Sequence, residues 1–401
     1  MKKVLTVSVI VASLGYFVDI YDLLLFSIVR IKSLTDLGLT GDELTNKGLL
    51  LINMQMGGML IGGILFGILG DKKGRISILF GSILLYSLAN ILNGFVHDYQ
   101  TYAFLRFVAG VGLAGELGAG VSLVSESLPK EIRGLGTMLI TTVGVSGAVL
   151  AWFVADTFSW RTAYFIGGGI GLLLLALRIG VFESGMFSKM KTENVSKGNF
   201  LSLFTNFDRF KRYMTCIFIG FQFWYIVGIL ITLSPEFARA LNVTGEIQAG
   251  RAVMYFYAGL TLGDFTSGFL SYLVKSRKKI LALFIILSGF GNILFFLAHG
   301  ISKDLFYILI FAMGVFSGYW ALFVTVAAES FGTNLRATVA TTVPNFVRGS
   351  LVPISALFAF LKGSTSLNNA GMIVGVICML FSFFAIYAYK DTYFKDLDYY
   401  E

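Results

Sequence analysis

Long runs of apolar residues recur along the chain, and short segments with polar and charged residues separate them. Each run is about 20 residues long, which is the length that an α-helix needs to cross a hydrocarbon layer of ~30 Å. The pattern predicts an all-α membrane protein with twelve transmembrane helices. These predicted helices lie at residues 5–29, 48–69, 76–96, 101–124, 136–156, 161–183, 213–233, 250–274, 279–298, 304–328, 338–360 and 368–389.

The polar segments between the predicted helices repeat at half the length of the chain. The segment Glu126–Arg133 begins with Glu-Ser and ends with Arg, and Glu329–Arg336 does the same about 200 residues later. The segment Gly67–Arg75 has a weaker counterpart at 268–279. An apolar chain that repeats in this way is typical of a transporter whose site lies between two similar halves.

The repeat predicts two pseudo-symmetric bundles of six helices each. We expect the first bundle at residues 1–183 and the second at residues 213–401. Between them, the stretch 184–212 is hydrophilic and basic, and we expect it to be a linker on the cytoplasmic surface.

Composition and charge agree with a multi-pass membrane protein. Hydrophobic residues make up 56% of the chain and charged residues 13%, against roughly 45–50% and about 25% in soluble domains. The net charge of +8 does not indicate nucleic-acid binding, because most of the 31 Lys and Arg residues lie on one side of the predicted helices. The positive-inside rule then places both termini in the cytoplasm, and we expect the protein in the cell inner membrane.

Enzymatic and metal chemistry have no support in the sequence. Cys216 and Cys378 both lie in predicted helices, which indicates neither a disulfide nor a metal site. A phosphate-binding loop, a zinc-ligand spacing and a nucleophile–base arrangement are all lacking. We therefore expect neither an enzyme nor an ATP-driven pump, with no metal and no cofactor beyond a proton as coupling ion.

Four motifs carry a resemblance to a known family. The loop Gly67–Arg75, with Asp71 followed by basic residues, resembles the signature loop of the major facilitator superfamily. The segments Arg106–Glu116 and Glu126–Arg133 are similar to those of its sugar-porter, organic-ion and metabolite–proton symporter branches. The run Asp19–Asp22 resembles the acidic-x-Tyr-Asp motif of metabolite–proton symporters. The resemblance covers essentially the whole chain and implies twelve helices around a central cavity.

A set of charged residues is predicted to act as a conformational latch and not to bind substrate. Each lies at the cytoplasmic end of a predicted helix or in a turn, where it can pair with another helix end or with the other half. The set consists of Asp71, Arg75, Glu126, Arg133, Glu329 and Arg336.

Acidic residues inside predicted helices are the candidates for proton coupling. At 1.5 Å per residue, Asp22 and Arg106 lie at similar depth on antiparallel helices, so we expect an ion pair between them. Desolvation and a nearby Arg act in opposite directions on such a carboxyl group, so a conformational change can load or release its proton. The resemblance to sugar porters implies that Asp22 carries the proton and that Arg106 is its partner. Asp19 lies on the same helix face, and Glu116 is a candidate relay. A static structural pair, and a structural role for Glu116, stay open as alternatives.

Arg348 is the candidate for substrate binding. It lies within the eleventh predicted helix, where a guanidinium needs an anion, and its planar fork suits a carboxylate or a phosphate. Organic-anion carriers resemble one another in having Arg at this position, whereas Asn345 matches the metabolite–proton symporters. The alternative is a structural pair of Arg348 with Asp19 or Asp264.

Further polar and aromatic residues are predicted to complete a cavity lined mainly by the first, fourth, seventh, eighth, tenth and eleventh helices. Buried hydroxyl, amide and indole groups at lipid depth need partners. The candidates are Tyr21, Gln222, Trp224, Tyr225, Tyr257, Tyr319 and Trp320.

These observations predict a secondary active transporter that takes up a small organic anion, of the carboxylate type, together with protons by rocker-switch alternating access. Its expected partners are the small-molecule substrate, the proton and membrane lipids, and we expect a monomer. Three alternatives stay open: a zwitterion symporter for an amino acid or betaine, with Asp19 binding the ammonium group; an exporter of organic or metal cations; and a sensor that binds ligand without transporting it.

Overall fold

The structure is a computed structural model that describes residues 5–129, 132–177 and 198–401. Within these ranges, eleven helical segments are long and apolar enough to cross a membrane. The remaining predicted segment, 250–274, forms helix α14 (Ala249–Val274), which is less apolar and carries Arg251 and Asp264. Its 26 residues still extend about 39 Å at 1.5 Å per residue, enough to cross. The predicted all-α membrane fold is confirmed.

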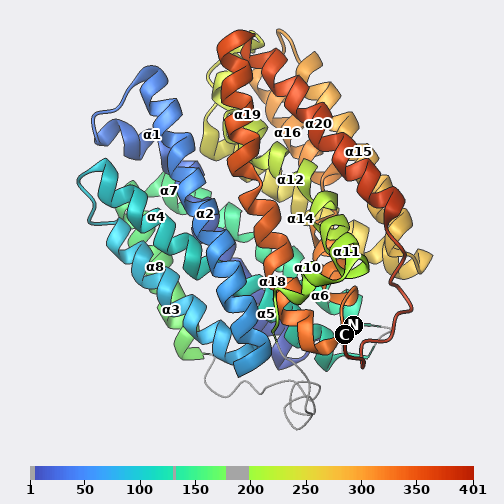
Figure 1. Cartoon of the computed structure of the whole chain (residues 1–401). Helices are drawn as coiled ribbons and strands as arrows, with labels where there is room; N and C mark the ends of the chain where they lie inside the picture. The colour runs from blue at the N-terminus through green and yellow to red at the C-terminus, as the bar shows by residue number, and fades with distance from the viewer. Residues whose placement is uncertain (1–4, 130–131, 178–197) are drawn as a thin grey trace.

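Each half is a bundle of helices joined by short connections (Figure 1). In the first half the helices are α1 (Val7–Asp36), α2 (Gly41–Lys73), α3 (Arg75–Asn93), α4 (Tyr99–Leu113), α5 (Glu116–Ser127), α6 (Arg133–Val145), α7 (Gly147–Thr157) and α8 (Trp160–Leu177). In the second half they are α10 (Ser202–Thr205), α11 (Phe207–Ile219), α12 (Phe221–Tyr225), the π-helix η1 (Ile226–Ile231), α13 (Ser234–Ala240), α14 (Ala249–Val274), α15 (Arg277–Leu297), α16 (Lys303–Phe316), α17 (Trp320–Glu329), α18 (Thr333–Gly349), α19 (Leu351–Ser364) and α20 (Leu367–Ala388).

Corresponding membrane-crossing segments are broken in both halves. In the first half, α4 gives way to α5 at Ala114–Gly115, and α6 gives way to α7 at Ser146. In the second half, α16 gives way to α17 at 317–319, and α18 gives way to α19 at Ser350. These are the fourth and fifth crossings of each half, so the breaks follow the pseudo-symmetry of the sequence. At the first of these breaks, the carbonyl of Ala114 accepts a hydrogen bond from Asn345 of the other half.

Glycine residues bring α2 against α4, and α14 against α16, at very short distance. A Cβ atom added to Gly58 would lie 2.1 Å from the carbonyl oxygen of Phe107. A Cβ atom added to Gly259, at the matching place in the second half, would lie 2.0 Å from the carbonyl oxygen of Phe311. Small residues of this kind drive helix packing in membranes, where no hydrophobic effect acts between helices.

The two halves meet along two seams. In one, α2 packs against α18, and in the other α14 packs against α1, α6 and α7. Figure 1 shows the start of α1 and the C-terminus at the same end of the molecule, which we call the termini end, and the α1–α2 connection at the opposite end. The seams enclose the candidate site, and each end carries contacts between the halves.

Candidate substrate site and its gates

A small cavity lies between the halves near the middle of the molecule. Its volume of about 10 Å³ is enough for roughly one water molecule. The first half contributes side chains of α1 and α6, and the second half those of α12, α14, α17 and α18. The lining residues are Tyr16, Ile20, Val145, Phe223, Trp224, Tyr257, Leu260, Trp320 and Arg348.

Arg348 supplies the positive charge of this cavity. It lies in the last turn of α18, directly before the break at Ser350, and is 1% exposed. Its Nη1 donates to Asn345 Oδ1 at 3.2 Å, and its Nη2 donates to the Tyr16 hydroxyl at 3.4 Å. Nη2 also lies 3.9 Å from Asp19 Oδ2. Arg348 thus faces the cavity and, at the same time, forms a long ion pair with Asp19.

Aromatic rings surround the guanidinium. The Arg348 Cζ lies 5.7 Å from the ring centroid of Trp320 and 6.0 Å from that of Trp224, within cation–π range. Phe223 stacks on Trp320 with centroids 4.7 Å apart. The indole Nε1 of Trp320 donates to the Tyr16 hydroxyl at 2.9 Å. One first-half side chain, Tyr16, therefore joins the two main polar groups of the second half.

Asn345 positions Arg348 and links the halves. Its Nδ2 donates at 2.7 Å to the carbonyl of Ala114, which lies at the α4–α5 break. The same Nδ2 donates to the carbonyl of Thr341 at 2.7 Å. Because its Oδ1 accepts from Arg348, the amide holds the guanidinium through backbone groups of both halves.

Four residues predicted to line the cavity lie elsewhere. The hydroxyl groups of Tyr21, Tyr225 and Tyr319 donate to backbone carbonyls of their own halves, on α8, α20 and α11. The Gln222 side chain faces α15. These side chains do not reach the cavity in this structure, because successive helix residues are rotated by about 100°, so that only some members of a polar run point to it. Trp224, Tyr257, Trp320 and Arg348 lie on it as predicted.

The predicted ion pair between Asp22 and Arg106 does not form among the described residues. The Arg106 Nη2 donates to Asn90 Oδ1 at 2.6 Å and its Nε to Asn93 Oδ1 at 3.2 Å. Asp22 instead lies against α8, where a Cβ atom on Gly167 would be 2.3 Å from its Oδ1. The prediction of a direct contact was wrong because two amides of α3 bind the Nε and Nη2 groups of the guanidinium. The prediction compared only the depths of Asp22 and Arg106 along their own helices, so it could not show the amide groups of a third helix.

Glu116 is the first residue of α5 and is buried directly after the break in the fourth crossing segment. It is not among the residues that line the cavity. Asp264 is also buried, and its Oδ1 accepts from the backbone N–H of Ala321 at 3.0 Å. Asp264 therefore binds the first turn of α17 and is not the partner of Arg348.

Asp71 joins the halves at the termini end. Its carboxylate accepts from the backbone N–H groups of Ala337 and Thr338 at 3.1 and 2.8 Å, and from the Thr338 hydroxyl at 2.7 Å. These groups belong to the first turns of α18, where the helix dipole favours a negative charge. The arrangement suits the predicted latch. The side chain of Arg75, also predicted for the latch, lies outside the described part of the structure.

The remaining latch residues form two reciprocal ion pairs, which we call the exchanged ion pairs: in each, an arginine of one half binds a glutamate of the other. Arg133 of the first half lies 3.0 Å from Glu329 of the second, and Arg336 of the second lies 3.2 Å from Glu126 of the first. Glu329 also binds Arg277, at 3.2 Å. Arg277 was not among the predicted site residues, although it stands in the second copy of the signature loop. All these side chains are buried, so the pairs close the termini end.

The segment 389–401, which we call the C-terminal strap, runs across these ion pairs. Arg133 Nη2 donates to the carbonyl of Lys395 at 2.6 Å, and the Thr392 hydroxyl donates to Glu329 at 2.8 Å. Glu401 lies 2.9 Å from Arg212. Burial opposes ionisation of Glu401, but its contacts with Arg212 and Arg209 outweigh burial and hold its pKa below the ordinary value. The strap thus contacts Arg133 of one half and Glu329 of the other.

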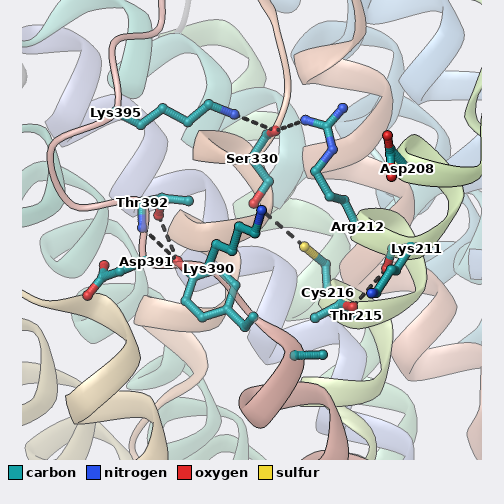
Figure 2. Close-up of a pocket in the computed structure, with 12 residues that line it drawn as sticks. Asp208, Lys211, Arg212, Thr215, Cys216, Ser330, Lys390, Asp391, Thr392 and Lys395 are labelled. Carbon is teal, nitrogen blue, oxygen red and sulfur yellow. Dashed lines mark hydrogen bonds between the residues drawn. The ribbon is translucent and has the colours of Figure 1, made fainter.

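A second pocket, of about 580 Å³, lies beneath the strap between α11 and α20 (Figure 2). Figure 2 shows Lys395 and Arg212 converging on Ser330, whose carbonyl accepts from each at 2.9 Å. Burial and the neighbouring positive charge of Arg212 hold the pKa of Lys395 below its ordinary value. This pocket has no lining residue in common with the cavity around Arg348.

Arg30 closes the opposite end. It lies on α1, is fully buried, and its Nη2 binds Glu236 at 2.9 Å and the carbonyl of Thr232 at 3.3 Å. Both partners belong to the second half. Contacts between the halves therefore exist at both ends, and the small cavity between them is occluded. This pair was missed because Arg30 follows the predicted end of the first helix and was assigned to a loop.

The sequence and the fold of this chain are similar to those of known transport proteins. The family model described as Major Facilitator Superfamily matches residues 7–356. A protein of Haemophilus influenzae named for metabolite transport is 25% identical over 96% of both chains. A protein of Bacillus subtilis named for niacin and nicotinamide transport is 25% identical over 84% of both chains. The solved structure of the proton:xylose symporter XylE has a TM-score of 0.74, with 16% identity and 96% of each chain covered.

Two helical bundles around an occluded central cavity define a membrane transporter and not an enzyme. The chain belongs to the Major Facilitator Superfamily, and its relatives include transporters of small metabolites.

Proposed function

We propose that the protein is a secondary active transporter that takes up a small organic carboxylate together with a proton. The observation that carries this proposal is the guanidinium of Arg348, buried in the cavity between the halves and 3.9 Å from Asp19. A buried guanidinium needs an anionic partner, and its planar fork suits a carboxylate. Niacin, one of the two compounds in the name of the Bacillus subtilis relative, is a carboxylate and supports this substrate class.

Asp19 is the group we propose to carry the proton. In the occluded state it shares Arg348 with the polar groups of the cavity. A substrate carboxylate on Arg348 would take this positive partner from Asp19, and a buried carboxylate without a cation favours its protonated form. Substrate and proton would then bind together, which is the requirement for symport. Asp22, Glu116 and Arg106 would affect the coupling from outside the cavity.

Alternating access would follow from the two gates. Separation of Arg30 from Glu236 opens one route to the cavity, and separation of Asp71 from α18, with the exchanged ion pairs, opens the other. We propose that the termini end faces the cytoplasm of the cell inner membrane, in accordance with the positive-inside rule. The protein would act as a monomer and without a cofactor.

The test is uptake of labelled carboxylates into proteoliposomes, with and without an inward proton gradient. We expect gradient-driven accumulation that falls by at least about tenfold in Arg348→Gln, since a buried charged hydrogen bond contributes about 1.5–3 kcal/mol. Asp19→Asn should retain exchange of labelled for unlabelled substrate but lose gradient-driven accumulation. Asp304→Asn, which changes an exposed carboxylate at the start of α16, is the matched control. Full accumulation by both Arg348→Gln and Asp19→Asn would disprove the proposal.

A zwitterionic substrate is the second candidate. Asp19 lies 3.9 Å from the cavity-lining Arg348, so opposite charges are close together there, and the two ends of an amino acid or betaine could bind them. Including proline and glycine betaine in the same uptake experiment separates the candidates. Uptake of these compounds in preference to simple carboxylates would favour the zwitterion.

A further inference from the structure

We infer that the substrate is a planar aromatic carboxylate, whose ring would lie among the aromatic side chains of the second half and whose carboxylate would bind Arg348. This inference rests on the proposed function and narrows its substrate class.

Two buried donors of the cavity point to an acceptor that the described residues do not supply. Arg348 Nε and Trp224 Nε1 are both shielded from solvent, and neither has a hydrogen-bond partner in the described part of the chain. Both residues line the cavity. Buried polar groups without partners are rare in native proteins, since each costs about 1–3 kcal/mol. A carboxylate beside Arg348 offers two oxygen acceptors, enough for both donors.

The walls next to these donors are aromatic. Phe223 and Trp320 stack at a centroid distance of 4.7 Å with an interplanar angle of 27°. Trp224 meets Trp320 edge-on at 6.3 Å. Tyr257 lies on the same cavity. Aromatic pairs in stacked or edge-to-face geometry gain energy beyond the area that they bury, so a flat ring would find favourable partners among these side chains.

The remaining wall is aliphatic and excludes ligands with many hydroxyl groups. Ile20 and Val145 come from the first half and Leu260 from the second. A polyhydroxylated ligand would place hydroxyl groups against these side chains without partners, which is costly. An aromatic acid has one charged end and an otherwise apolar body, and this distribution matches the cavity.

The occluded volume of about 10 Å³ is far smaller than the ~150 Å³ cavity that is known to bind benzene. A ring can therefore enter only when the halves move apart. Tyr16 lies on α1 of the first half, and its hydroxyl accepts from both Trp320 and Arg348. Movement of α1 away from the second half would release these two donors and uncover the faces of Trp224 and Trp320.

The experiment compares benzoate with cyclohexanecarboxylate, which has the same charge and a similar size but no π-face. Calorimetric titration of the purified protein should show benzoate binding about tenfold more tightly, given 0.5–1.5 kcal/mol for each aromatic pair. Benzyl alcohol, which has the ring without the carboxylate, should not bind measurably. In Trp320→Leu, the preference for benzoate should fall to about twofold or less. Trp224→Leu should lower this preference as well and should also weaken the binding of both acids, because it removes the Nε1 donor to the carboxylate.

Trp152→Phe on α7, outside the cavity, is the matched control and should keep the tenfold preference. Equal affinity of the wild-type protein for the two acids would overturn the aromatic inference, and it would leave the proposed carboxylate transport intact. Failure to bind or transport any carboxylate would overturn the proposed function itself. The comparison on the wild-type protein does not depend on the folding of any variant.

Discussion

Single residues decide which buried charges are partners. The sequence predicted that Arg106 and Arg348 lie within the membrane and need acceptors, and both are buried. The identity of the acceptors depended on neighbouring helices, because Asn90 and Asn93 of α3 bind Arg106 in place of Asp22. Helix rotation likewise separated Trp224, which faces the cavity, from its neighbour Tyr225. Depth could be predicted from residue number, but the direction of a side chain could not.

The bond between Arg106 and Asn90 leads to a prediction about stability. Replacing Asn90 with Ala removes the acceptor at 2.6 Å from the guanidinium. We expect the free energy of unfolding to fall by about 1.5–3 kcal/mol, as for other hydrogen bonds to charged groups. Denaturant unfolding in detergent micelles measures this change. Asn46→Ala, at an exposed position of α2, is the control and should be neutral; equal stability of both variants would contradict the prediction.

At the scale of helices, the sequence predicted where the crossing segments lie, but not that the fourth and fifth crossings of each half and the first crossing of the second half are broken. The breaks arise at small and polar residues such as Gly115, Ser146 and Ser350. These residues also occur in unbroken helices, so their presence alone is a weak signal. Gly58 belongs to a spaced series of glycines in the second predicted helix; such a series is typical of close helix packing, but it does not identify α4 as the partner.

Neighbouring glycines on α2 should respond very differently to substitution. Gly58→Ala places a Cβ atom 2.1 Å from a carbonyl oxygen of α4, whereas Gly57→Ala meets nothing within 4 Å. We expect Gly58→Ala to destabilise the protein by about 1–3 kcal/mol, as overpacking does, and Gly57→Ala to leave stability unchanged or slightly higher. Thermal unfolding followed by intrinsic fluorescence measures both. A loss in Gly57→Ala as large as in Gly58→Ala would contradict the predicted packing.

The C-terminal strap should stabilise the closed termini end. Without residues 389–401, Arg133 and Glu329 lose the partners that the strap supplies. We expect the distance between spin labels on Lys72 and Lys275, exposed at this end in different halves, to shift to larger values. Double electron–electron resonance, with Cys216 and Cys378 replaced by Ala, measures it. An unchanged distance distribution would show that the strap does not hold the gate.

Attachment of the strap should also weaken in acid. The pKa of Glu401 lies below its ordinary value of 4.5, because Arg212 and Arg209 favour the charged form more than burial opposes it. The stabilisation is therefore complete above about pH 4.5 and is lost as the pH falls through the lowered pKa. The same label pair, measured over this acid range, should report opening in the wild-type protein. Glu401→Gln should already be open at neutral pH and show less dependence on pH.

At the scale of the whole molecule, the repeat predicted two related bundles, and their ion pairs show how those bundles interact. Arg133 of the first half binds Glu329 of the second, and Arg336 of the second half binds Glu126 of the first. The two arginines occupy equivalent positions in the repeat, and so do the two glutamates. The sequence placed these residues at helix ends of one side, but it could not show that each binds across the interface. The fold could thus be predicted from the periodicity, whereas the occluded state depends on contacts between distant residues.

Exchanging the charges of one ion pair tests this interface. Glu126→Arg alone places two guanidinium groups together and should open the termini end, as should Arg336→Glu alone. The double variant restores opposite charges and should recover much of the closed population, as a double-mutant cycle would reveal. The Lys72–Lys275 distance distribution is the readout, and uptake activity is a second one. Additive effects of the two substitutions would show that the residues act independently.

The exchanged ion pairs have a consequence for the synthesis of the protein. Glu126 and Arg133 leave the ribosome and enter the membrane about 200 residues before their partners Arg336 and Glu329. During this interval the first bundle holds charged side chains at its end whose final partners do not yet exist, so water or lipid headgroups must solvate them. The gate can form only after the second bundle has been inserted. The ion pairs that we propose to control transport are therefore among the last contacts to form during synthesis and membrane insertion.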